Sequence, residues 1–235
     1  MFFSKMAPLP FPGAVVGTVH SLRSLTAALA LRKNAVDFLE VRVDAFTQTD
    51  ACAHLEKNIR RLRAPLIVTV RHPLEGGAGR LSPSQRRALF QRFLPFASLV
   101  DVELRSANSL QDVIAEAQSS GIGVILSHHD FRKTPSLARL RELRQNAKSA
   151  GGSIFKVAAT TRTPRDLATL LEFLTSPGGA SPSLAVMGMG AFGKISRLAL
   201  GKAGSVLNYG YLDKQQVSGQ WPAALLKERL AELSK

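Results

Sequence analysis

The sequence predicts a single (β/α)8 barrel over residues 1–235, and two observations carry this prediction. Eight short runs of apolar and β-branched residues alternate with eight stretches of helical periodicity. The expected strands begin roughly 20 to 35 residues apart, and the 235-residue chain is close to the length of about 250 residues typical of such barrels. An open, doubly wound parallel sheet is the alternative, because sequence periodicity does not show whether a sheet closes.

The strands are expected where β-branched and other apolar residues form short, uninterrupted runs. Several of these runs end in polar residues, which is where a barrel of this kind carries its functional side chains. In chain order, the expected strands cover residues 14–19, 36–43, 66–70, 99–104, 123–127, 153–157, 184–187 and 205–209.

The helices are expected between the strands, where apolar residues recur with helical spacing. Ser82-Pro83 and Thr163-Pro164 each combine a capping residue with proline at the first helical position. No linker rich in proline or glycine divides the chain, so we expect one domain, with residues 1–13 as a flexible N-terminal extension. In chain order, the expected helices cover residues 21–34, 50–63, 82–93, 109–119, 136–150, 164–174, 196–200 and 222–233.

The composition excludes several classes of protein. A hydrophobic fraction of 45% argues against a disordered chain. The single cysteine, Cys52, excludes a disulfide framework and is expected to be a buried thiol, and no Cys/His cluster has the spacing of a zinc site. Prolines interrupt the apolar N-terminus, and no stretch is suited to crossing a membrane, so we expect a cytoplasmic protein without a metal.

The net charge of +14 raises the question of a polyanionic partner. The basic residues are spread along the chain, however, and many lie in segments that have the pattern of amphipathic helices, such as residues 60–63 and 139–144. We therefore expect a solvated basic surface with no nucleic-acid or membrane partner. Such a surface can also attract a small anionic substrate.

Charged residues alternate with valines where the second strand ends, in Glu40-Val41-Arg42-Val43-Asp44. The period of two places the three charged residues on one face and the valines on the other. Charges at the mouth of a barrel are costly unless they are paired, so this face is either a functional site or an ion-pair network. The next two strands also end in charged residues, namely Arg71 and Asp101-Val102-Glu103.

Lys156 is the most informative single residue, because it stands alone among apolar neighbours in the sixth strand. Burial and nearby cations such as Arg71 favour the neutral, nucleophilic form of an amine. Lysines of this kind form Schiff bases with carbonyl substrates. An ion pair with Glu40 or Glu103, or a position on the surface, is the alternative.

His129 is a candidate general acid and base, since an unperturbed histidine titrates near neutral pH. Its neighbour His128 is expected on the opposite face of the fifth strand, so only one of the two should reach the site. Glu75, in the loop after the third strand, is placed to orient the imidazole.

Taken together, these segments resemble the type I 3-dehydroquinate dehydratases, the Schiff-base dehydratases of the shikimate pathway. The matching segments follow the order of the family along nearly the whole chain. They are Glu40-Val-Arg42-Val-Asp44, Val70-Arg71-x3-Glu75-Gly76-Gly77, Asp101-Val-Glu103-Leu, Ser127-x-His129-Asp130-Phe131-x2-Thr134-Pro135, Lys156-Val-Ala158, Met187-Gly188-x4-Gly193-Lys194-Ile195-Ser196-Arg197, Gly204-Ser205 and Gly219-Gln220.

The resemblance implies a role for each candidate catalytic residue. Lys156 would form an imine with the ketone of 3-dehydroquinate. His129 would remove a proton from the adjacent carbon and then help the hydroxyl leave as water, with Glu75 supporting the histidine. The resemblance also implies a homodimer and a reaction that needs no cofactor.

The same resemblance implies the substrate contacts. Arg197 and Gln220 would hold the carboxylate, for which arginine supplies a planar, bidentate donor. Thr18 would face the substrate from the first strand. The remaining charged residues, Glu40, Arg42 and Arg71, would bind ring hydroxyls or fix their neighbours.

The chain departs from the family pattern at two places. The last loop of the family usually reads Ser-small-Pro-Gly-Gln, whereas here Gln216 falls at the serine position and Ser218 at the proline position. Either Gln216 replaces the hydrogen bond of the serine to the substrate, or the loop lies differently. In the lysine strand, Ser153 stands where the family often has an acidic residue.

Two other functions stay open at this point. A non-catalytic basic barrel that binds nucleic acid or another polyanion would explain the net charge, but it leaves His129 and Lys156 without a role. Another Schiff-base barrel of the aldolase type is the second alternative. The segments His129-Asp130-Phe131 and Gly193-Lys194-Ile195-Ser196-Arg197 argue against it.

Overall fold

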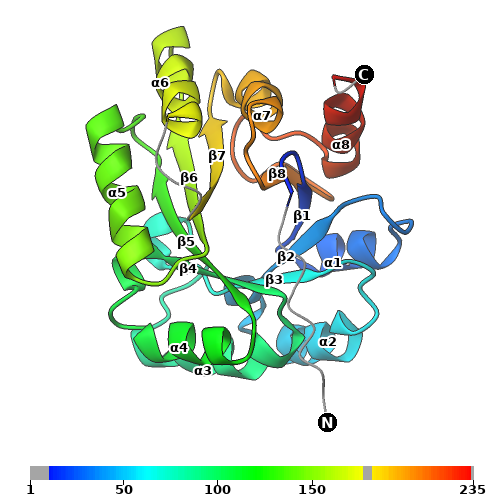
Figure 1. Cartoon of the computed structure of the whole chain (residues 1–235). Helices are drawn as coiled ribbons and strands as arrows, with labels where there is room; N and C mark the ends of the chain where they lie inside the picture. Colours follow the sequence, from blue (N-terminus) through cyan, green and yellow to red (C-terminus); the bar gives the residue numbers. More distant parts are fainter. Residues whose placement is uncertain (1–10, 177–181, 234–235) are drawn as a thin grey trace.

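Parallel strands form the inner wall of the structure, and helices form its outer layer (Figure 1). The computed structural model describes residues 11–176 and 182–233. The expected N-terminal extension, residues 1–13, lies outside the described residues except for its last three positions. The eight-stranded barrel predicted from the sequence is confirmed.

The strands follow one another around the barrel in the order β7-β6-β5-β4-β3-β2-β1-β8, and all the ladders are parallel. Where β7 meets β8, the backbone N–H of Val206 donates to the carbonyl of Leu184 at 2.9 Å. This sequential order and the near closure exclude the open, doubly wound sheet. The strands are β1 (Val15–Val19), β2 (Phe38–Arg42), β3 (Leu66–Thr69), β4 (Leu99–Glu103), β5 (Gly123–Asp130), β6 (Ile154–Thr160), β7 (Ser183–Met189) and β8 (Asn208–Tyr211).

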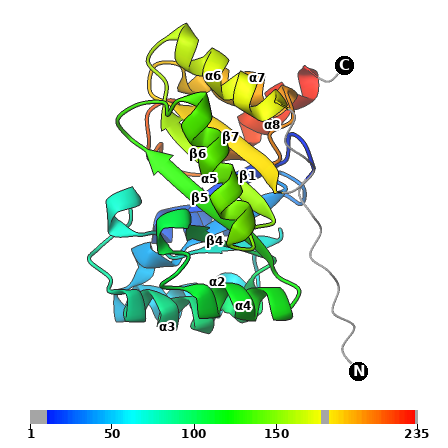
Figure 2. The same ribbon diagram turned by 60° about the vertical axis from the view of Figure 1, so that its left-hand side comes forward.

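The helices pack around the outside of the barrel, as the turned view shows (Figure 2). Capping boxes begin α1, α3 and α6, in which the side chains of Ser21, Ser82 and Thr163 accept the backbone N–H three residues later. The helices are α1 (Leu22–Leu29), α2 (Thr49–Ile59), α3 (Pro83–Phe93), α4 (Gln111–Ser119), α5 (Leu137–Ser149), α6 (Pro164–Thr175), α7 (Gly193–Lys202) and α8 (Ala223–Glu232).

Element boundaries differ from the expected ones where pairing or turn geometry decides them. β5 continues to Asp130 because its ladder with β6 extends to the pair Asp130 and Ala159. α1 ends early, and the chain then passes through Asn34 with a φ of 64°. Four short 3-10 helices follow strands or helices, at Val43–Phe46, Pro73–Glu75, Leu94–Phe96 and Leu104–Ser106.

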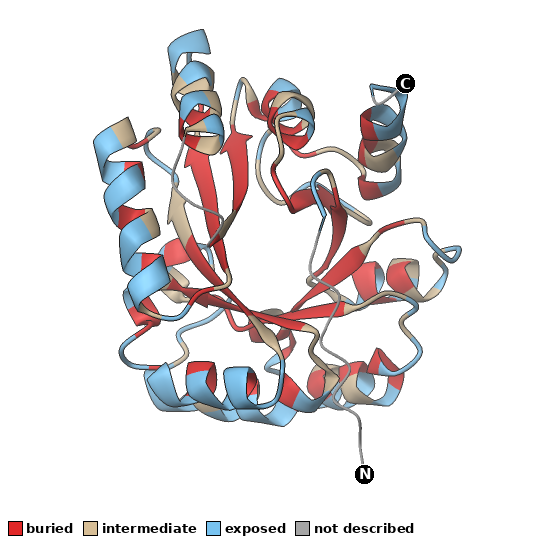
Figure 3. Ribbon diagram, viewed as in Figure 1, coloured by how far each residue is buried: buried red, intermediate tan, exposed pale blue. Residues whose placement is uncertain are grey.

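The buried apolar side chains form two layers, one outside and one inside the ring of strands. The outer layer lies between strands and helices and includes Val41 and Val43, as the alternation in β2 predicted. The strands are buried, whereas the helices expose their outer faces (Figure 3). The inner layer fills one end of the barrel and includes Val16, Phe38, Ile67, Leu99, Ile125 and Ile154. Because this end is filled, a ligand has access only from the carboxyl ends of the strands.

Cys52 is a free, buried thiol on α2, as expected. No helix in the described parts of the chain has the length and apolar character needed to cross a membrane. Within the same residues, no group of three or more His, Cys, Asp or Glu side chains is arranged to hold a metal ion.

Candidate active site

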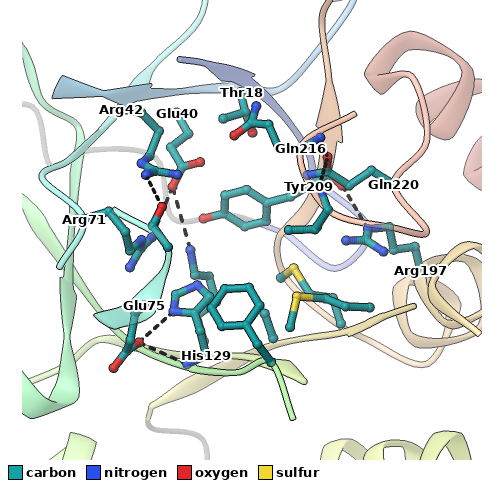
Figure 4. A pocket seen from close by; sticks show the side chains of 17 residues that line it. Thr18, Glu40, Arg42, Arg71, Glu75, His129, Arg197, Tyr209, Gln216 and Gln220 are labelled. Atoms are coloured by element: carbon teal, nitrogen blue, oxygen red, sulfur yellow. Dashed lines mark hydrogen bonds and ion pairs between the residues drawn. The ribbon is translucent and has the colours of Figure 1, made fainter. Parts of the chain in front are cut away.

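One pocket at the carboxyl ends of the strands brings together the ten residues for which the sequence predicted a catalytic or substrate-binding role. Figure 4 shows this pocket with all of them labelled except Lys156. The volume of the pocket is about 270 Å³, close to the lower end of the roughly 300–1,000 Å³ range of small-molecule sites. The residues come from strands β1, β2, β5 and β6, from the loops after β3 and β8, and from helix α7, so only the barrel places them side by side. They are Thr18, Glu40, Arg42, Arg71, Glu75, His129, Lys156, Arg197, Gln216 and Gln220.

Lys156 lies inside the barrel in the middle of β6, with its side chain only 3% exposed. Its Nζ is 2.5 Å from Asp101 Oδ2 and 3.8 Å from Glu40 Oε1. The same nitrogen lies 4.3 Å from the centre of the Tyr209 ring. The lysine is therefore not on the surface. Of the two carboxylates expected as possible partners, Glu40 forms an ion pair with it and Glu103 does not, and the nearest carboxylate is Asp101.

Arg71 connects the acidic residues around the lysine. Its guanidinium donates to both oxygens of Asp101 at 3.0 and 3.1 Å, to Glu103 at 3.0 Å and to Ser127 at 2.8 Å. Burial opposes its charge, but Asp101, Glu103 and Glu40 hold the pKa of Arg71 well above its ordinary value. With its donors occupied in this way, Arg71 fixes the carboxylates in place.

Asp101 carries a permanent negative charge beside Lys156. Burial alone would raise the pKa of this carboxyl, but Arg71 and Lys156 hold it well below its ordinary value. An anion with such a low pKa is a poor proton acceptor. Asp101 therefore acts electrostatically, because its negative charge stabilises a positive charge on Lys156 Nζ.

Arg86 completes this ion-pair cluster from outside the barrel and was not predicted as a site residue. It is 2% exposed and donates to the carbonyl of Val70 at 2.8 and 2.9 Å, to Ser106, and to the second oxygen of Glu103. The signal in the sequence is its spacing: Arg86 shares the buried face of α3 with Phe90 and Phe93.

Arg42 lies at the rim of the pocket and is held by Asp44. Its Nε and Nη2 donate to the two Asp44 oxygens at 2.9 and 2.7 Å, and Nη2 also donates to the Gly76 carbonyl at 2.9 Å. Asp44 itself does not line the pocket. The face expected to hold Glu40, Arg42 and Asp44 is therefore interrupted, because β2 ends at Arg42 and Asp44 lies in the following 3-10 turn.

His129 and Glu75 form a hydrogen-bonded pair. His129 Nδ1 lies 2.8 Å from Glu75 Oε2, and the backbone N–H of His129 donates to the same oxygen at 3.1 Å. His128, on the opposite face of β5, does not line the pocket. The expectation that only one of the two histidines reaches the site is confirmed by this geometry.

The environment favours a neutral imidazole at His129. Burial first, and then the charges of Arg71 and Lys156, lower the pKa of His129 well below its ordinary value. Burial and Glu103 raise the pKa of Glu75 to about 7. With the Nδ1–H donated to an ionised Glu75, the unprotonated Nε2 is the basic nitrogen of the ring.

Arg197 is a buried cation without an acidic partner among the described residues. Its Nε donates to the Tyr209 carbonyl at 3.1 Å, and Nη1 donates to three further carbonyl oxygens, of Gly188, Gly193 and Gly219. Burial lowers its pKa to about 10. A buried cation that is 1% exposed and lines a pocket favours an anionic ligand there.

The loop between β8 and α8 covers one side of the pocket. Gln220 Oε1 accepts the backbone N–H of Gln216 at 2.8 Å, and the side-chain Nε2 of Gln216 lies 2.5 Å from His20 Nδ1. The loop packs tightly on α7, where a Cβ at Gly193 would lie 2.7 Å from the Cα of Gly219. Gln216 thus lines the pocket with its amide nitrogen already bonded within the protein.

The pocket wall also contains Tyr209 and several apolar residues that were not predicted as site residues from the sequence. The hydroxyls of Thr18 and Tyr209 are buried without a hydrogen-bond partner in the described structure, so each can bond to a polar ligand. Burial, with Glu40 and Asp101 nearby, raises the pKa of Tyr209 well above its ordinary value, so its hydroxyl is protonated. The remaining wall is mostly apolar and is formed by Phe131, Ala158, Met187, Met189 and Val217.

The alternation along the strands contains the signal for part of this wall. Ala158 is two residues after Lys156, and it pairs in register with Met187 of β7. A period of two therefore places both residues on the face of the lysine. Tyr209 carries no comparable signal, because a tyrosine in a strand is more often part of a core.

A family model, related sequences and solved structures all match this chain to the same family. The family described as type I 3-dehydroquinase matches residues 14–235. A 3-dehydroquinate dehydratase from Methanocella arvoryzae is 32% identical over 212 residues, which cover 90% of this chain and 93% of that protein. The crystal structure of 3-dehydroquinate dehydratase from Geobacillus kaustophilus is similar with a TM-score of 0.83 at 26% identity, covering 94% of this chain and 91% of that one. The corresponding Aquifex aeolicus structure has a TM-score of 0.80 at 28% identity, with coverage of 94% and 99%.

Proposed function

The chain belongs to the type I 3-dehydroquinase family, and on this basis we propose that it converts 3-dehydroquinate to 3-dehydroshikimate and water. It acts as a lyase of the shikimate pathway through a lysine Schiff base. The observation that carries the mechanism is the position of Lys156, buried beside Asp101 in a pocket that His129 also lines.

The imine forms on Lys156. Nζ, which is ion-paired with Asp101, first gives one proton to a base in the pocket, for which the neutral ring of His129 is available, and then attacks the ketone carbon. The carbonyl oxygen takes that proton and a second proton from Nζ and leaves as water, so the iminium nitrogen keeps one proton and the positive charge. Asp101, 2.5 Å from this nitrogen, stays ionised and stabilises that charge. The iminium withdraws electrons from the adjacent carbon more strongly than the ketone does, and this makes its proton acidic.

His129 transfers the protons. Its neutral ring accepts the proton from the carbon adjacent to the iminium and then donates it to the departing hydroxyl, which leaves as water. The lowered pKa of His129 ensures that the free base is present at neutral pH. Glu75 accepts the Nδ1–H and so fixes both the tautomer and the direction of the ring.

Replacing Glu75 by glutamine tests this orienting role. We expect kcat to fall by about 10²-fold, because an amide donates as readily as it accepts and no longer fixes the tautomer. In the unchanged protein, a Glu75 pKa of about 7 predicts that kcat rises with pH through this region, as the carboxylate that accepts Nδ1–H forms. The Glu75→Gln profile should lack that step, and retention of it would contradict the assignment.

The substrate carboxylate is held by Arg197 and Gln220. Arg197 supplies a buried positive charge, and the side chain of Gln220 lines the same part of the pocket. Glu40, Arg42 and the unpartnered hydroxyl groups of Thr18 and Tyr209 are placed to bind the hydroxyl groups of the substrate ring. Arg71 contributes indirectly, by holding Glu40 and Asp101.

The substitution Arg197→Lys should raise KM by about 10- to 100-fold, because a single ammonium group cannot both hold the surrounding carbonyl oxygens, as Nε and Nη1 do, and supply a donor to the carboxylate, as Nη2 can. The exposed Arg165 on α6 provides a matched control, since Arg165→Lys makes the same chemical change away from the pocket. Steady-state kinetics with 3-dehydroquinate measure both variants. An unchanged KM in Arg197→Lys would remove Arg197 from the carboxylate site.

Reductive trapping tests the proposed function against its alternatives. The protein is incubated with 3-dehydroquinate and sodium borohydride, and peptides are then analysed by mass spectrometry. We expect a substrate-derived adduct on Lys156 alone. A barrel that only binds polyanions would give no adduct, and an aldolase-type enzyme would be trapped by its own carbonyl substrate rather than by 3-dehydroquinate.

The expected homodimer and the cytoplasmic location are part of this proposal, as is the expectation that nucleic acid is not a partner. Light scattering after size-exclusion chromatography measures the oligomeric state directly. Competition by duplex DNA against substrate turnover tests the polyanion alternative, and we expect no inhibition at physiological salt concentration.

A further inference from the structure

The histidine that follows β1 bonds to the loop over the pocket. His20 Nδ1 lies 2.5 Å from Gln216 Nε2, although the two residues are 196 positions apart in the chain. An amide nitrogen only donates, so Nδ1 accepts and the ring proton resides on Nε2. That Nε2 is 3.8 Å from Asp213 Oδ1, too far for a hydrogen bond, and neither of these two atoms has a hydrogen-bond partner among the described residues.

The loop is attached at both of its ends, by different contacts. Toward α8, the Gly219 carbonyl accepts from Arg197 at 2.8 Å, and the Ser218 carbonyl accepts from the backbone of Gly190 at 2.9 Å. Toward β8, the backbone N–H of Tyr211 donates to the Trp221 carbonyl at 2.9 Å. Beyond Tyr211, the side-chain contacts of this part of the loop include the bond between His20 and Gln216 and a contact of 3.4 Å between Ser21 Oγ and Asp213. Loss of His20 would therefore release mainly the part of the loop near β8.

Gln216 connects this attachment to the carboxylate site. Its backbone N–H donates to Gln220 Oε1 at 2.8 Å, so the position of the Gln216 main chain determines where the Gln220 amide points. We propose that His20 is a positioning residue, which holds the loop through Gln216 and thereby keeps Gln220 directed at the substrate carboxylate. The identity of the substrate in this inference rests on the proposed function. The attachment of the loop by His20 does not depend on that function.

The contact between His20 and Gln216 depends on the departure of this chain from the family pattern, in which position 216 is usually a serine. A serine at position 216 would be too short to span the distance that the glutamine side chain covers to His20. Burial lowers the pKa of His20, so the neutral ring that accepts the amide proton is present at neutral pH. Gln216 thus connects the loop to His20, the residue directly after β1, through its amide nitrogen. Its amide oxygen stays available to a ligand.

Hydrogen exchange and kinetics of a His20→Leu variant test the proposal together. We expect the backbone amides of residues 212–219 to exchange at least about fivefold faster than in the unchanged protein, with exchange elsewhere unaltered. KM for 3-dehydroquinate should rise by about five- to tenfold, while kcat changes less than about twofold, because Lys156 and His129 are untouched. His20→Asn, which restores an acceptor near the position of Nδ1, should recover most of the KM.

Two further variants separate this role from a general loss of stability. Gln215→Leu changes an exposed neighbour in the same loop and should leave both exchange and KM unaltered. In a double-mutant cycle, His20→Leu should have little further effect on KM once Gln216→Leu is present. Unchanged exchange in residues 212–219 of His20→Leu would overturn the proposal, even if the protein failed to act on 3-dehydroquinate. Absence of that turnover in the unchanged protein would instead overturn the proposed function.

Discussion

Replacing Lys156 by alanine is expected to reduce turnover of 3-dehydroquinate by about 10⁵-fold or more, as with loss of the nucleophile in other covalent enzymes. Without the amine there is no iminium ion, and the proton next to a plain ketone is too weakly acidic for a histidine to remove. His129, Glu75 and Arg197 remain in place, but they have no activated carbon on which to act.

The fold should survive this substitution with reduced stability. Within the buried cluster, the carboxylates of Glu40, Asp101 and Glu103 face the cations of Arg71, Arg86 and Lys156. Loss of the lysine leaves Asp101 its two bonds to Arg71, so the carboxylate is not left alone. We expect a lower Tm with an unchanged circular dichroism spectrum.

Lys148, which is exposed on α5, is the matched control for this experiment. Lys148→Ala should retain full turnover and should still give the borohydride adduct, whereas Lys156→Ala should give none. Substantial activity in purified Lys156→Ala, after contaminating enzyme has been excluded, would rule out the Schiff-base mechanism for this protein.

The substitution His129→Ala should lower turnover by about 10²- to 10⁴-fold, through loss of the general base. In contrast to Lys156→Ala, the variant should still condense with substrate, because the amine and its partner Asp101 are unchanged. The covalent intermediate should therefore accumulate and be trapped by borohydride at higher occupancy than in the unchanged protein. Condensation itself also needs proton transfers, so it should be slower.

His128→Ala is the control that the chain itself provides, since His128 is adjacent in sequence but lies on the other face of β5. Its turnover should be close to that of the unchanged protein. Near-normal turnover in His129→Ala would refute its role as the base. A folded His129→Ala protein that cannot be trapped would show that His129 acts before the carbon–hydrogen bond breaks.

The sequence predicted the fold well because its signals are local. Alternating strand and helix patterns at regular spacing indicated the barrel, and capping residues such as Ser82 and Thr163 marked helix starts that the structure confirms. The ends of the strands were less well predicted. β5 is longer than expected because its bonding partner β6 continues alongside it, and pairing between strands is not a local property.

The candidate site was predictable to the extent that strand alternation determines which way a side chain points. His129 and Lys156 point into the barrel because each lies on the inward face of its own strand. Arg86 and His20 were missed because nothing in their neighbourhoods indicates what they contact. Arg86 reaches Glu103 of β4 from a helix outside the barrel, and His20 meets a loop 196 residues away.

Residue types and their order along the chain were therefore sufficient to indicate a barrel and a buried amine with a histidine on a neighbouring strand. Only the tertiary structure decided which charges are paired. It places Asp101 rather than Glu103 against the lysine, and it surrounds Arg71 with carboxylates, while Arg197 bonds only to carbonyl oxygens among the residues that the structure describes. The physical reason is that pairing and desolvation depend on distances between strands, and those distances exist only once the barrel has closed.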